Sequence, residues 1–471
     1  MLHVIPLEVK VRELIPKAFL AYKILSNRKD AEVIIGPQRL LFNRINTFKN
    51  AIYFEKNTYH KRLGINFNLK DNYLCMLDEE GPIHLFDDTG MKFRYSIEKI
   101  NKIDKFYFWG KKDIKKLPLQ YLKQKKKIQI SGHPKFDILK KPYNKIFSNE
   151  LSYIKKKYGK YVLFVSSFED DSDTAIARNT SIIKELNKNK KNKYIKRKIE
   201  MKKYVDANSK NYKITIEMLK KLAKENPNLN FIFRKHPHEN ENEILKKFGS
   251  IPKNLFLEYK FQVSSWIIGS SIYIHSGCTT SFEAACCNKN IVCFIPNNNF
   301  QRYETFKKFG KFFSQKRQCI DYVNKLIKNI GSIKDVNYRQ LYPLIYNLEK
   351  KKLFFKIFLR DINKLKNDKK SEAIFTEIYD TPLSKIIYSI KKPILSILSF
   401  IKNHIFLNSF FMKFLPEKHL YSKKDAIRKF DKLEKKDLSK ILKKFLIIEN
   451  KKNIKIAINQ ISDSVFCIKN H

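Results

Sequence analysis

The sequence predicts an α/β protein built from two parallel-sheet domains, and three observations lead to this prediction. Short apolar runs alternate with helical stretches of ten or more residues, which is typical of βαβ units. This alternation occurs twice, in residues 1–150 and 151–335, on either side of a Lys-rich connector, "NELSYIKKKYGK". A chain of 471 residues is also long enough for two or three domains.

The first half has six predicted strands around one long predicted helix. The strands are expected over residues 3–7, 31–36, 50–54, 72–78, 105–110 and 127–132, and the helix over residues 12–28. Several of these strands end in a glycine or an acidic residue. Because functional loops follow the carboxyl ends of strands in α/β sheets, we expect functional residues at these ends.

The second half repeats the pattern and then changes character. Strands are expected over residues 161–168, 230–237, 254–259, 271–277 and 290–296, and helices over residues 212–227, 261–270 and 279–289. A basic, low-complexity insertion at residues 184–204 is predicted to be a mobile loop. From residue 336 the pattern is mostly helical, and residues 452–471 fit either a helix or a small closing pair of strands.

The chain is strongly basic, with 96 Lys and Arg against 46 Asp and Glu and a formal net charge of +50. Such a charge suits nucleic acid, anionic membranes or phosphorylated substrates. Lys, Asn and Ile are nevertheless abundant even in loops, as an AT-rich codon bias would produce. No RRM, KH, helix-turn-helix or zinc-finger pattern occurs, so we expect no nucleic-acid partner.

Cysteine usage and hydropathy predict a cytoplasmic location. None of the seven cysteines forms a C-x-x-C pair, which favours reduced thiols. We expect no signal peptide, and no apolar run reaches the ~18 residues of a membrane-spanning helix. Residues 391–416 come closest, with Lys402 and His404 among the interruptions. Two interpretations stay open there: basic amphipathic helices on the inner face of the cytoplasmic membrane, or a helical hairpin packed on the protein.

The most informative string is "IHSGCTTSFEA", residues 274–284, where a strand turns into a helix. Its loop combines hydroxyl groups with a glycine and the N–H groups of a helix N-terminus, which suits an anion such as a phosphate. Glu283 could accept from ribose hydroxyls or close a capping box. The residues expected to bind a nucleotide phosphate are Ser276, Gly277, Thr279, Thr280 and Glu283.

A second candidate anion site lies in "FIFRKHPHENENE", residues 231–243. Pro237 stiffens the turn and holds His236 at the end of a predicted strand. A histidine there can donate to a phosphate oxygen, and Arg234 or Lys235 can offset the phosphate charge. This turn is expected at the same sheet edge as the hydroxyl loop.

In the first half, "NYLCMLDEEGPI", residues 72–83, runs a strand into Asp78, Glu79 and Glu80. Repulsion among adjacent carboxylates should raise the pKa of at least one of them, and such a carboxylate can act as a general base. The alternative is a solvated acidic turn. The acidic run "FEDDSD", residues 168–173, invites a metal-site interpretation, but we expect no metal.

These motifs together resemble a known group of enzymes. "DEEG", "HP" and "SGCTT" look like the motif set of bacterial GT-B sialyltransferases, polysialyltransferases and capsule Kdo transferases. The strings "IPLEVKVREL", "SGHPKFDIL", "RKHPHE" and "HSGCTTSFEAA" are similar to the bacterial surface carbohydrate (surface polysaccharide) biosynthesis protein family. The resemblance covers roughly residues 3–300. No G-x-G-x-x-G or Walker A sequence is present, which disfavours dehydrogenases and P-loop NTPases.

The resemblance implies GT-B architecture, in which two Rossmann-like domains face a cleft. Residues 1–150 would be the acceptor-side domain, residues 151–335 the nucleotide-sugar-binding domain, and residues 336–471 a helical, basic region that could associate with a membrane. It implies a catalytic base at Glu79 or Glu80, beside Asp78. "SGHPKFDIL" also resembles a turn of UDP-N-acetylglucosamine 2-epimerases and of the lipid A Kdo transferase. The residues expected to line the cleft are His133, Ser166 and Ser167. For His133 and the nearby Asp137 a second interpretation stays open, namely that they only form the turn between the domains.

The implied function is transfer of a sugar in surface polysaccharide, capsule or lipopolysaccharide biosynthesis. The donor would be a nucleotide-sugar, a CMP-activated nonulosonic acid or Kdo, and the acceptor a glycan or lipid-linked precursor. No cofactor is expected. Three alternatives stay open: a sugar-nucleotide epimerase or hydrolase of the same architecture, a CDP-glycerol-type polyol-phosphate transferase, and a basic scaffold without enzymatic activity.

Overall fold

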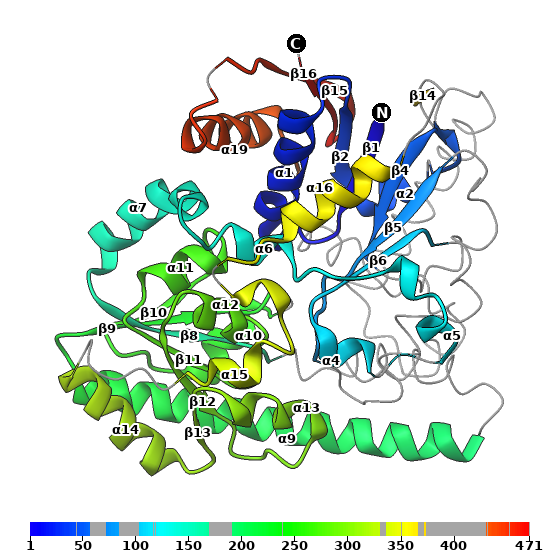
Figure 1. The fold of residues 1–471 in the computed structure, drawn as a ribbon. Coiled ribbons are helices and arrows are strands. Elements are labelled where there is room, and N and C mark those ends of the chain that lie inside the picture. Colours follow the sequence, from blue (N-terminus) through cyan, green and yellow to red (C-terminus); the bar gives the residue numbers. More distant parts are fainter. Residues whose placement is uncertain are drawn as a thin grey trace, which may run out of the picture.

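The chain forms two parallel sheets flanked by helices, as Figure 1 shows. The computed structural model describes residues 1–43, 45–56, 72–83, 103–115, 117, 119–168, 191–237, 239–329, 336–349, 351–365, 372–373, 430, 432–451 and 453–470. Two predicted features, the acids of residues 169–173 and the apolar segment 391–416, lie outside these residues. The predicted fold class, α/β with two parallel-sheet domains, is confirmed.

The first sheet has the strand order β15-β16-β2-β1-β4-β5-β6-β7, and its strands from β2 to β7 are all parallel. Each was predicted as a short apolar run, because strands buried on both faces of a sheet carry few polar residues. Their bounds are β1 Leu2–Leu7, β2 Glu32–Pro37, β4 Ala51–Glu55, β5 Tyr73–Leu77, β6 Lys105–Phe108 and β7 Ile128–Ile130.

Helices and short turns connect these strands, and the longest helix of this domain, α1 (Lys10–Asn27), packs on the sheet with all of residues 13–25 buried. The shorter elements of this domain are α2 Gln38–Asn43, η1 Ile45–Thr47, α4 Lys111–Ile114, α5 Leu119–Leu122, η4 Lys125–Lys127, α6 Pro134–Asp137 and η5 Tyr143–Phe147. A two-residue strand, β3 Phe48–Lys49, pairs with β14 Glu372–Ala373.

The second sheet, order β10-β9-β8-β11-β12-β13, is parallel throughout. Its strands are β8 Tyr161–Val165, β9 Asn230–Arg234, β10 Leu255–Glu258, β11 Ile272–His275, β12 Asn290–Phe294 and β13 Lys311–Phe313. Its helices are α7 Ser148–Tyr158, α9 Lys191–Glu225, α10 Glu241–Phe248, α11 Val263–Gly269, α12 Ser281–Cys286, α13 Gln301–Glu304, η6 Phe306–Lys308 and α14 Lys316–Lys328.

Helix α9 corrects one prediction. Residues 191–204, expected to belong to a mobile loop, are helical and continuous with the helix predicted from residue 212. Met201, Tyr204, Asn208 and Asn211 are buried at spacings of three and four residues, which is one face of a helix. The many lysines between these positions hide the spacing in the sequence.

Beyond residue 336 the chain returns to the first sheet. The helices α15 Tyr338–Leu341, η7 Tyr346–Leu348, α16 Phe354–Lys364 and α19 Lys435–Ile448 are followed by a strand pair, β15 Ile456–Ser462 and β16 Val465–Asn470. Strand β16 pairs antiparallel with β2, and α19 packs on α1. The chain end therefore forms the strand pair rather than a helix, and it extends the first sheet. Among the described residues, none of the helices has the length and apolar character needed to cross a membrane.

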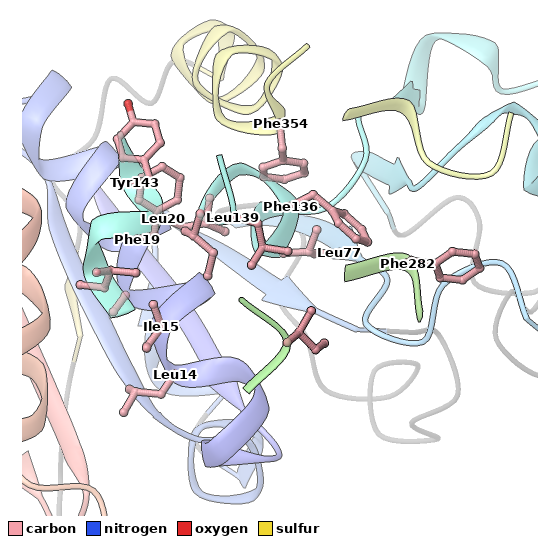
Figure 2. Packing of buried hydrophobic residues seen from close by; sticks show 14 of the residues in the cluster. Leu14, Ile15, Phe19, Leu20, Leu77, Phe136, Leu139, Tyr143, Phe282 and Phe354 are labelled. Carbon is pink, nitrogen blue, oxygen red and sulfur yellow. The ribbon is translucent and has the colours of Figure 1, made fainter. Parts of the chain in front are cut away.

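The two domains share one hydrophobic core. Figure 2 shows side chains from α1, from β5, from the segment around α6, and from α12 and α16 packed in the same region. Phe282 of the second domain and Phe136 of the first belong to the same buried cluster. Two smaller clusters lie within the second and the first domain, respectively. The loops that follow β7 and β11 are thus held by packing between the domains as well as by their own hydrogen bonds.

A partly buried ionic contact anchors the end of α19 to the first domain. The Glu449 carboxylate accepts from the Tyr22 hydroxyl at 2.7 Å and the Tyr143 hydroxyl at 2.6 Å, and it pairs with Lys23. Burial raises the pKa of Glu449, but these donors outweigh burial and lower the pKa to about 2. The Lys23 ammonium also lies 4.1 Å from the centroid of the Phe355 ring.

We predict that Glu449→Gln lowers the free energy of unfolding by about 2–4 kcal/mol at pH 7, because it leaves the Lys23 ammonium without its carboxylate. The loss should shrink as the pH falls from 4.5 toward 2, since a lowered pKa contributes stability only while the group is ionised. Urea unfolding from pH 7 to pH 3 measures this. Lys451→Gln, which removes a partly exposed partner of Glu449 at 3.6 Å, is the control with less than about 1 kcal/mol expected. An equal loss at pH 7 and at pH 3 would contradict the stabilising role of the ionised Glu449.

Candidate functional site

The predicted site residues follow the carboxyl ends of strands in both sheets. Asp78–Glu80 follow β5 and His133 follows β7 in the first sheet. In the second sheet, Ser166 and Ser167 follow β8, His236 follows β9, and Ser276 follows β11. Because β9 and β11 both flank β8, their loops lie at one edge of that sheet.

Glu79 is a buried carboxylate with two partners. Its Oε2 lies 3.0 Å from His133 Nε2, and its Oε1 lies 3.2 Å from the Lys17 ammonium. Lys17 itself donates to the Pro6 carbonyl at 2.6 Å and to Glu13 at 2.9 Å. Glu79 therefore ties the turn after β5 to α1 and to the loop after β7.

The pKa of Glu79 is lowered rather than raised. Burial raises the pKa of this carboxyl, but the charge of Lys17 and the contact with His133 outweigh burial and hold the pKa well below its usual value. We expected repulsion among the three acids to raise the pKa of at least one. For Glu79 the attraction of the nearby Lys17 ammonium outweighs any repulsion from the neighbouring carboxylates, so the pKa is lowered.

The two neighbouring acids have different surroundings. Asp78 Oδ1 accepts the Glu80 N–H at 2.9 Å, and the Asp78 carbonyl accepts Trp109 Nε1–H at 2.6 Å, so Asp78 shapes the turn. Gly81 has φ of +71°, and a Cβ there would lie 2.8 Å from the Trp109 ring. The Glu80 side chain is 50% exposed and lies 3.7 Å from Arg12. Of the three acids, Glu80 is the one that a substrate can reach.

His133 is buried and its tautomer follows from its contacts. Its Nδ1 accepts the Lys135 N–H at 3.2 Å, so the ring hydrogen is on Nε2 and is donated to Glu79. Burial lowers the pKa of His133, and Glu79 opposes this only in part. His133 is thus a neutral donor that orients Glu79, with neither ring nitrogen available as a base.

The two domains meet at an ion pair beside the dyad of Glu79 and His133. The Lys135 ammonium lies 3.8 Å from Glu283 of α12 and 4.3 Å from the centroid of a Trp109 ring. Glu283 also accepts from the Ser264 hydroxyl at 2.6 Å. The alternative interpretation of Glu283, a capping box, does not apply, because no side chain caps α12. Glu283 instead faces the first domain.

The hydroxyl loop after β11 is internally bonded, which corrects part of the predicted phosphate site. The Ser276 hydroxyl donates to the Phe294 carbonyl at 2.5 Å, and the Thr280 hydroxyl lies 2.7 Å from the Tyr273 hydroxyl. The Ser167 hydroxyl donates to the Ser276 carbonyl at 2.7 Å, so the loops after β8 and β11 are joined. Thr279 is partly exposed and remains a candidate phosphate donor.

Two backbone N–H groups of this loop donate to a histidine. The Gly277 and Cys278 amides donate to His275 Nδ1 at 3.2 and 3.1 Å. Burial lowers the pKa of His275 to about 3, so the ring is neutral and accepts. Gly277 has φ of +81°, as a tight turn requires. Helix α12, with six residues, is also too short to contribute much of a dipole.

Only part of the basic turn after β9 is available to bind a phosphate. Arg234 is 4% exposed and donates to the Lys260 carbonyl at 2.9 Å and the Phe261 carbonyl at 2.6 Å. Burial lowers the pKa of Arg234 to about 10. Arg234 therefore supports the fold, which corrects its predicted phosphate role.

The other residues of this turn lie closer to the surface. Lys235 lies 3.2 Å from Glu241, the backbone of His236 donates to Glu239, and Pro237 is half-buried. Ser166, at the adjacent strand end, accepts the Phe168 N–H at 3.2 Å and is buried. His236, half-buried, is thus the residue of this edge that we retain as a phosphate donor.

A cation that the sequence did not point to lies beside the hydroxyl loop. Arg302 of α13 donates to the Tyr204 hydroxyl of α9 at 2.6 Å. Tyr303 packs on Gly277, where a Cβ would come within 2.8 Å of its ring. Burial raises the pKa of the Cys278 thiol, and the charge of Arg302 partly opposes this. Nothing in "NFQRYETF" marks this arginine in the sequence, because its neighbours in space come from α9 and β11.

In the part of the chain that the structure describes, no group of three or more His, Cys, Asp or Glu side chains could hold a metal ion. Four basic side chains lie at the candidate site, namely Arg12, Lys17 and Lys135 on the first domain and Arg302 on the second.

Comparisons with known proteins found similarity at the level of structure. No protein-family model matches the chain, and no curated protein matches it. The S. aureus MnaA–UDP structure has a TM-score of 0.48 and 13% identity, covering 79% of this chain and 98% of that one.

Two other solved structures give similar values. The wall teichoic acid polymerase TagF has a TM-score of 0.46 and 10% identity, covering 78% of this chain and 90% of that one. UDP-GlcNAc 2-epimerase from Neisseria meningitidis bound to UDP-GlcNAc has a TM-score of 0.46 and 12% identity, covering 77% and 99%.

We predict that His133 stays neutral with its hydrogen on Nε2 at pH 7 and titrates below 6.5, because burial disfavours the imidazolium. Two-dimensional ¹⁵N–¹H spectra of protein with ¹⁵N-labelled histidine rings measure both properties, with His133→Gln assigning the signal. A hydrogen on Nδ1, or a midpoint above 6.5, would contradict the described pair.

Proposed function

We propose that this protein is a glycosyltransferase of bacterial surface polysaccharide or lipopolysaccharide biosynthesis. It would transfer a sugar from a nucleotide-activated donor to a glycan or lipid-linked acceptor. The observation that carries the proposal is the junction at Lys135 and Glu283. There the loop that carries His133, the partner of Glu79, contacts α12, the helix that follows the hydroxyl loop of the other sheet.

In this proposal Glu80 is the general base that takes the proton of the acceptor hydroxyl. Its exposure supports this role, because a base must come within hydrogen-bond distance of the proton it removes. Glu79 has both oxygens engaged and a low pKa, so it acts as a positioning residue. Arg12 lies 3.7 Å from Glu80 and offsets the negative charge of this carboxylate.

The donor would bind at the edge of the second sheet, with its phosphate at the loop of residues 276–280. His236, Thr279 and Arg302 are the side chains that can donate to it there. Basic side chains can stabilise the leaving nucleotide without a metal or cofactor. The CMP-linked nonulosonic acid or Kdo comes from the motif resemblance. A lipid-linked acceptor would put the reaction in the cytoplasm, at the inner face of its membrane.

We predict that Glu80→Gln lowers the rate of sugar transfer by about 10² to 10⁴-fold with little change in donor affinity, because a glutamine cannot take the proton. Transfer from CMP-, UDP- and GDP-sugars to deacylated cell-surface glycolipid, followed by mass spectrometry, measures this. Glu304→Gln, an exposed carboxylate 2.7 Å from Lys307, is the matched control and should retain full activity.

Full activity of Glu80→Gln would reject the assigned base. Breakdown or epimerisation of the donor without an acceptor, followed by NMR, would replace the proposal with an epimerase or hydrolase. Phosphate incorporated into the product would replace it with a polyol-phosphate transferase. Steeply salt-dependent nucleic-acid binding without any nucleotide binding would favour a basic scaffold.

We predict that Arg302→Gln weakens nucleotide binding about 10- to 100-fold, because it removes a charge-assisted hydrogen bond to the phosphate. Binding of the corresponding nucleoside, which has no phosphate, should not change. Isothermal titration calorimetry measures both. Lys316→Gln, which removes an exposed cation 2.7 Å from Glu217, is the control. Equal affinity of Arg302→Gln and the unmodified protein for the nucleotide would reject the role of Arg302.

A further inference from the structure

A buried asparagine far away in the sequence holds the loop that carries His133. Asn347, in η7, has a fully buried side chain. Its Oδ1 accepts the His133 N–H at 3.1 Å, and its Nδ2 donates to the His133 carbonyl at 2.9 Å. The side-chain amide thus pairs with both backbone groups of one residue, as a neighbouring strand would. An amide is the side-chain group that can donate and accept in this way at once.

The contact is specific to the residues on both sides. Asn347 Nδ2 also donates to Asp137 Oδ1 at 2.7 Å, at the other end of the short helix α6. At Gly132, φ is +80°, and a Cβ would lie 1.8 Å from Asn347 Oδ1. Only a glycine allows the amide to come this close. Asn347 and Gly132 are therefore a matched pair that fixes the backbone of residues 132–137.

Fixing this backbone sets the geometry of the dyad. The Lys135 N–H and the His133 ring belong to the same turn, and their 3.2 Å contact sets the tautomer of His133. The ring lies 5.1 Å from that of Trp109, which limits its rotation. With both constraints in place, the Nε2 hydrogen points at Glu79. Asn347 and Gly132 thus orient the acidic turn after β5 through His133.

The segment that carries Asn347 touches both domains. Its Tyr338 hydroxyl donates to the Ala285 carbonyl of α12 at 2.9 Å. Further along, the Lys112 N–H donates to the Pro343 carbonyl at 2.9 Å, and the Tyr346 N–H donates to the Trp109 carbonyl at 2.7 Å. The Lys140 ammonium donates to the carbonyl groups of Asn347, Glu349 and Lys352, at 2.5, 2.7 and 2.8 Å. Asn347 is therefore held on both sides and has little freedom to move away from His133.

We propose that Asn347 is a positioning residue: its side-chain amide holds the His133 loop so that His133 orients Glu79 beside Glu80. The kinetic part of this inference rests on the proposed transferase function, and its structural part does not. Asn347 touches neither Glu79 nor Glu80 in this arrangement, so it acts through His133 alone.

The test compares Asn347→Ala and Asn347→Asp with the unmodified full chain. Asn347→Asp has the same shape and keeps an acceptor for the His133 N–H, but it loses both donated bonds and puts a carboxylate beside Asp137. Asn324→Ala is the control, because Asn324 is an amide that also has side-chain partners, at 2.9 Å, but it is half-buried and lies in α14. The first readout is the ring ¹⁵N spectrum of His133, and the second is kcat and KM for transfer.

Both Asn347 variants should change the His133 spectrum, with loss of the single Nε2–H form, whereas Asn324→Ala should not. Transfer should lose about 10- to 100-fold in kcat with less than about a twofold change in KM for the donor, since misplacement affects the chemical step. An unchanged His133 spectrum in the folded variants would overturn the inference, whatever their activity.

The two readouts separate this inference from the proposed function. A changed His133 spectrum in a protein that transfers no sugar in any form would keep the positioning role and reject the transferase. A changed spectrum with full kcat would show that the orientation of His133 does not matter for transfer, and it would overturn the kinetic part. If Asn347→Ala does not fold, Asn347→Asp provides the same two readouts.

Discussion

The buried carboxylate of Glu79 is the contact on which the rest of the candidate site depends. A carboxylate in this position is costly unless cations and hydrogen-bond donors surround it, and here Lys17 and His133 supply both. Lys17 comes from α1 and His133 from the loop after β7, so one charge connects three parts of the first domain. The exposed Glu80 takes its position from this connection, because it follows Glu79 directly.

The second domain contacts the first in the same region. Phe136 and Phe282 belong to one buried cluster, as Figure 2 illustrates, and Lys135 pairs with Glu283 next to them. The His133 loop therefore supports the acidic turn on one side and contacts α12 on the other. A donor bound at the hydroxyl loop would lie one helix away from residues that orient the base. This arrangement suits a reaction between two substrates held by different domains.

The sequence predicted the strands well and the side-chain contacts poorly, for physical reasons. Parallel strands are buried on both faces, so their apolar runs stand out even in a Lys-rich chain. The hydrogen bonds of Ser276 and Arg234 could not be predicted. Their partners, the carbonyls of Phe294, Lys260 and Phe261, come close to them only in the folded sheet. Arg302 and Asn347 carry no local motif at all. The helix at residues 191–204 was missed because lysines separate its buried positions.

A crystal structure of the protein with a non-hydrolysable nucleotide-sugar tests the central claim most directly, namely that the junction between the two sheets is a donor and acceptor site. The account predicts a phosphate within hydrogen-bond distance of the loop of residues 276–280 and of Arg302. It also predicts that the reactive carbon of the sugar faces Glu80, with the Glu79–His133 contact of 3.0 Å retained. A nucleotide bound elsewhere on the chain, or no nucleotide bound at millimolar concentration, would contradict the account.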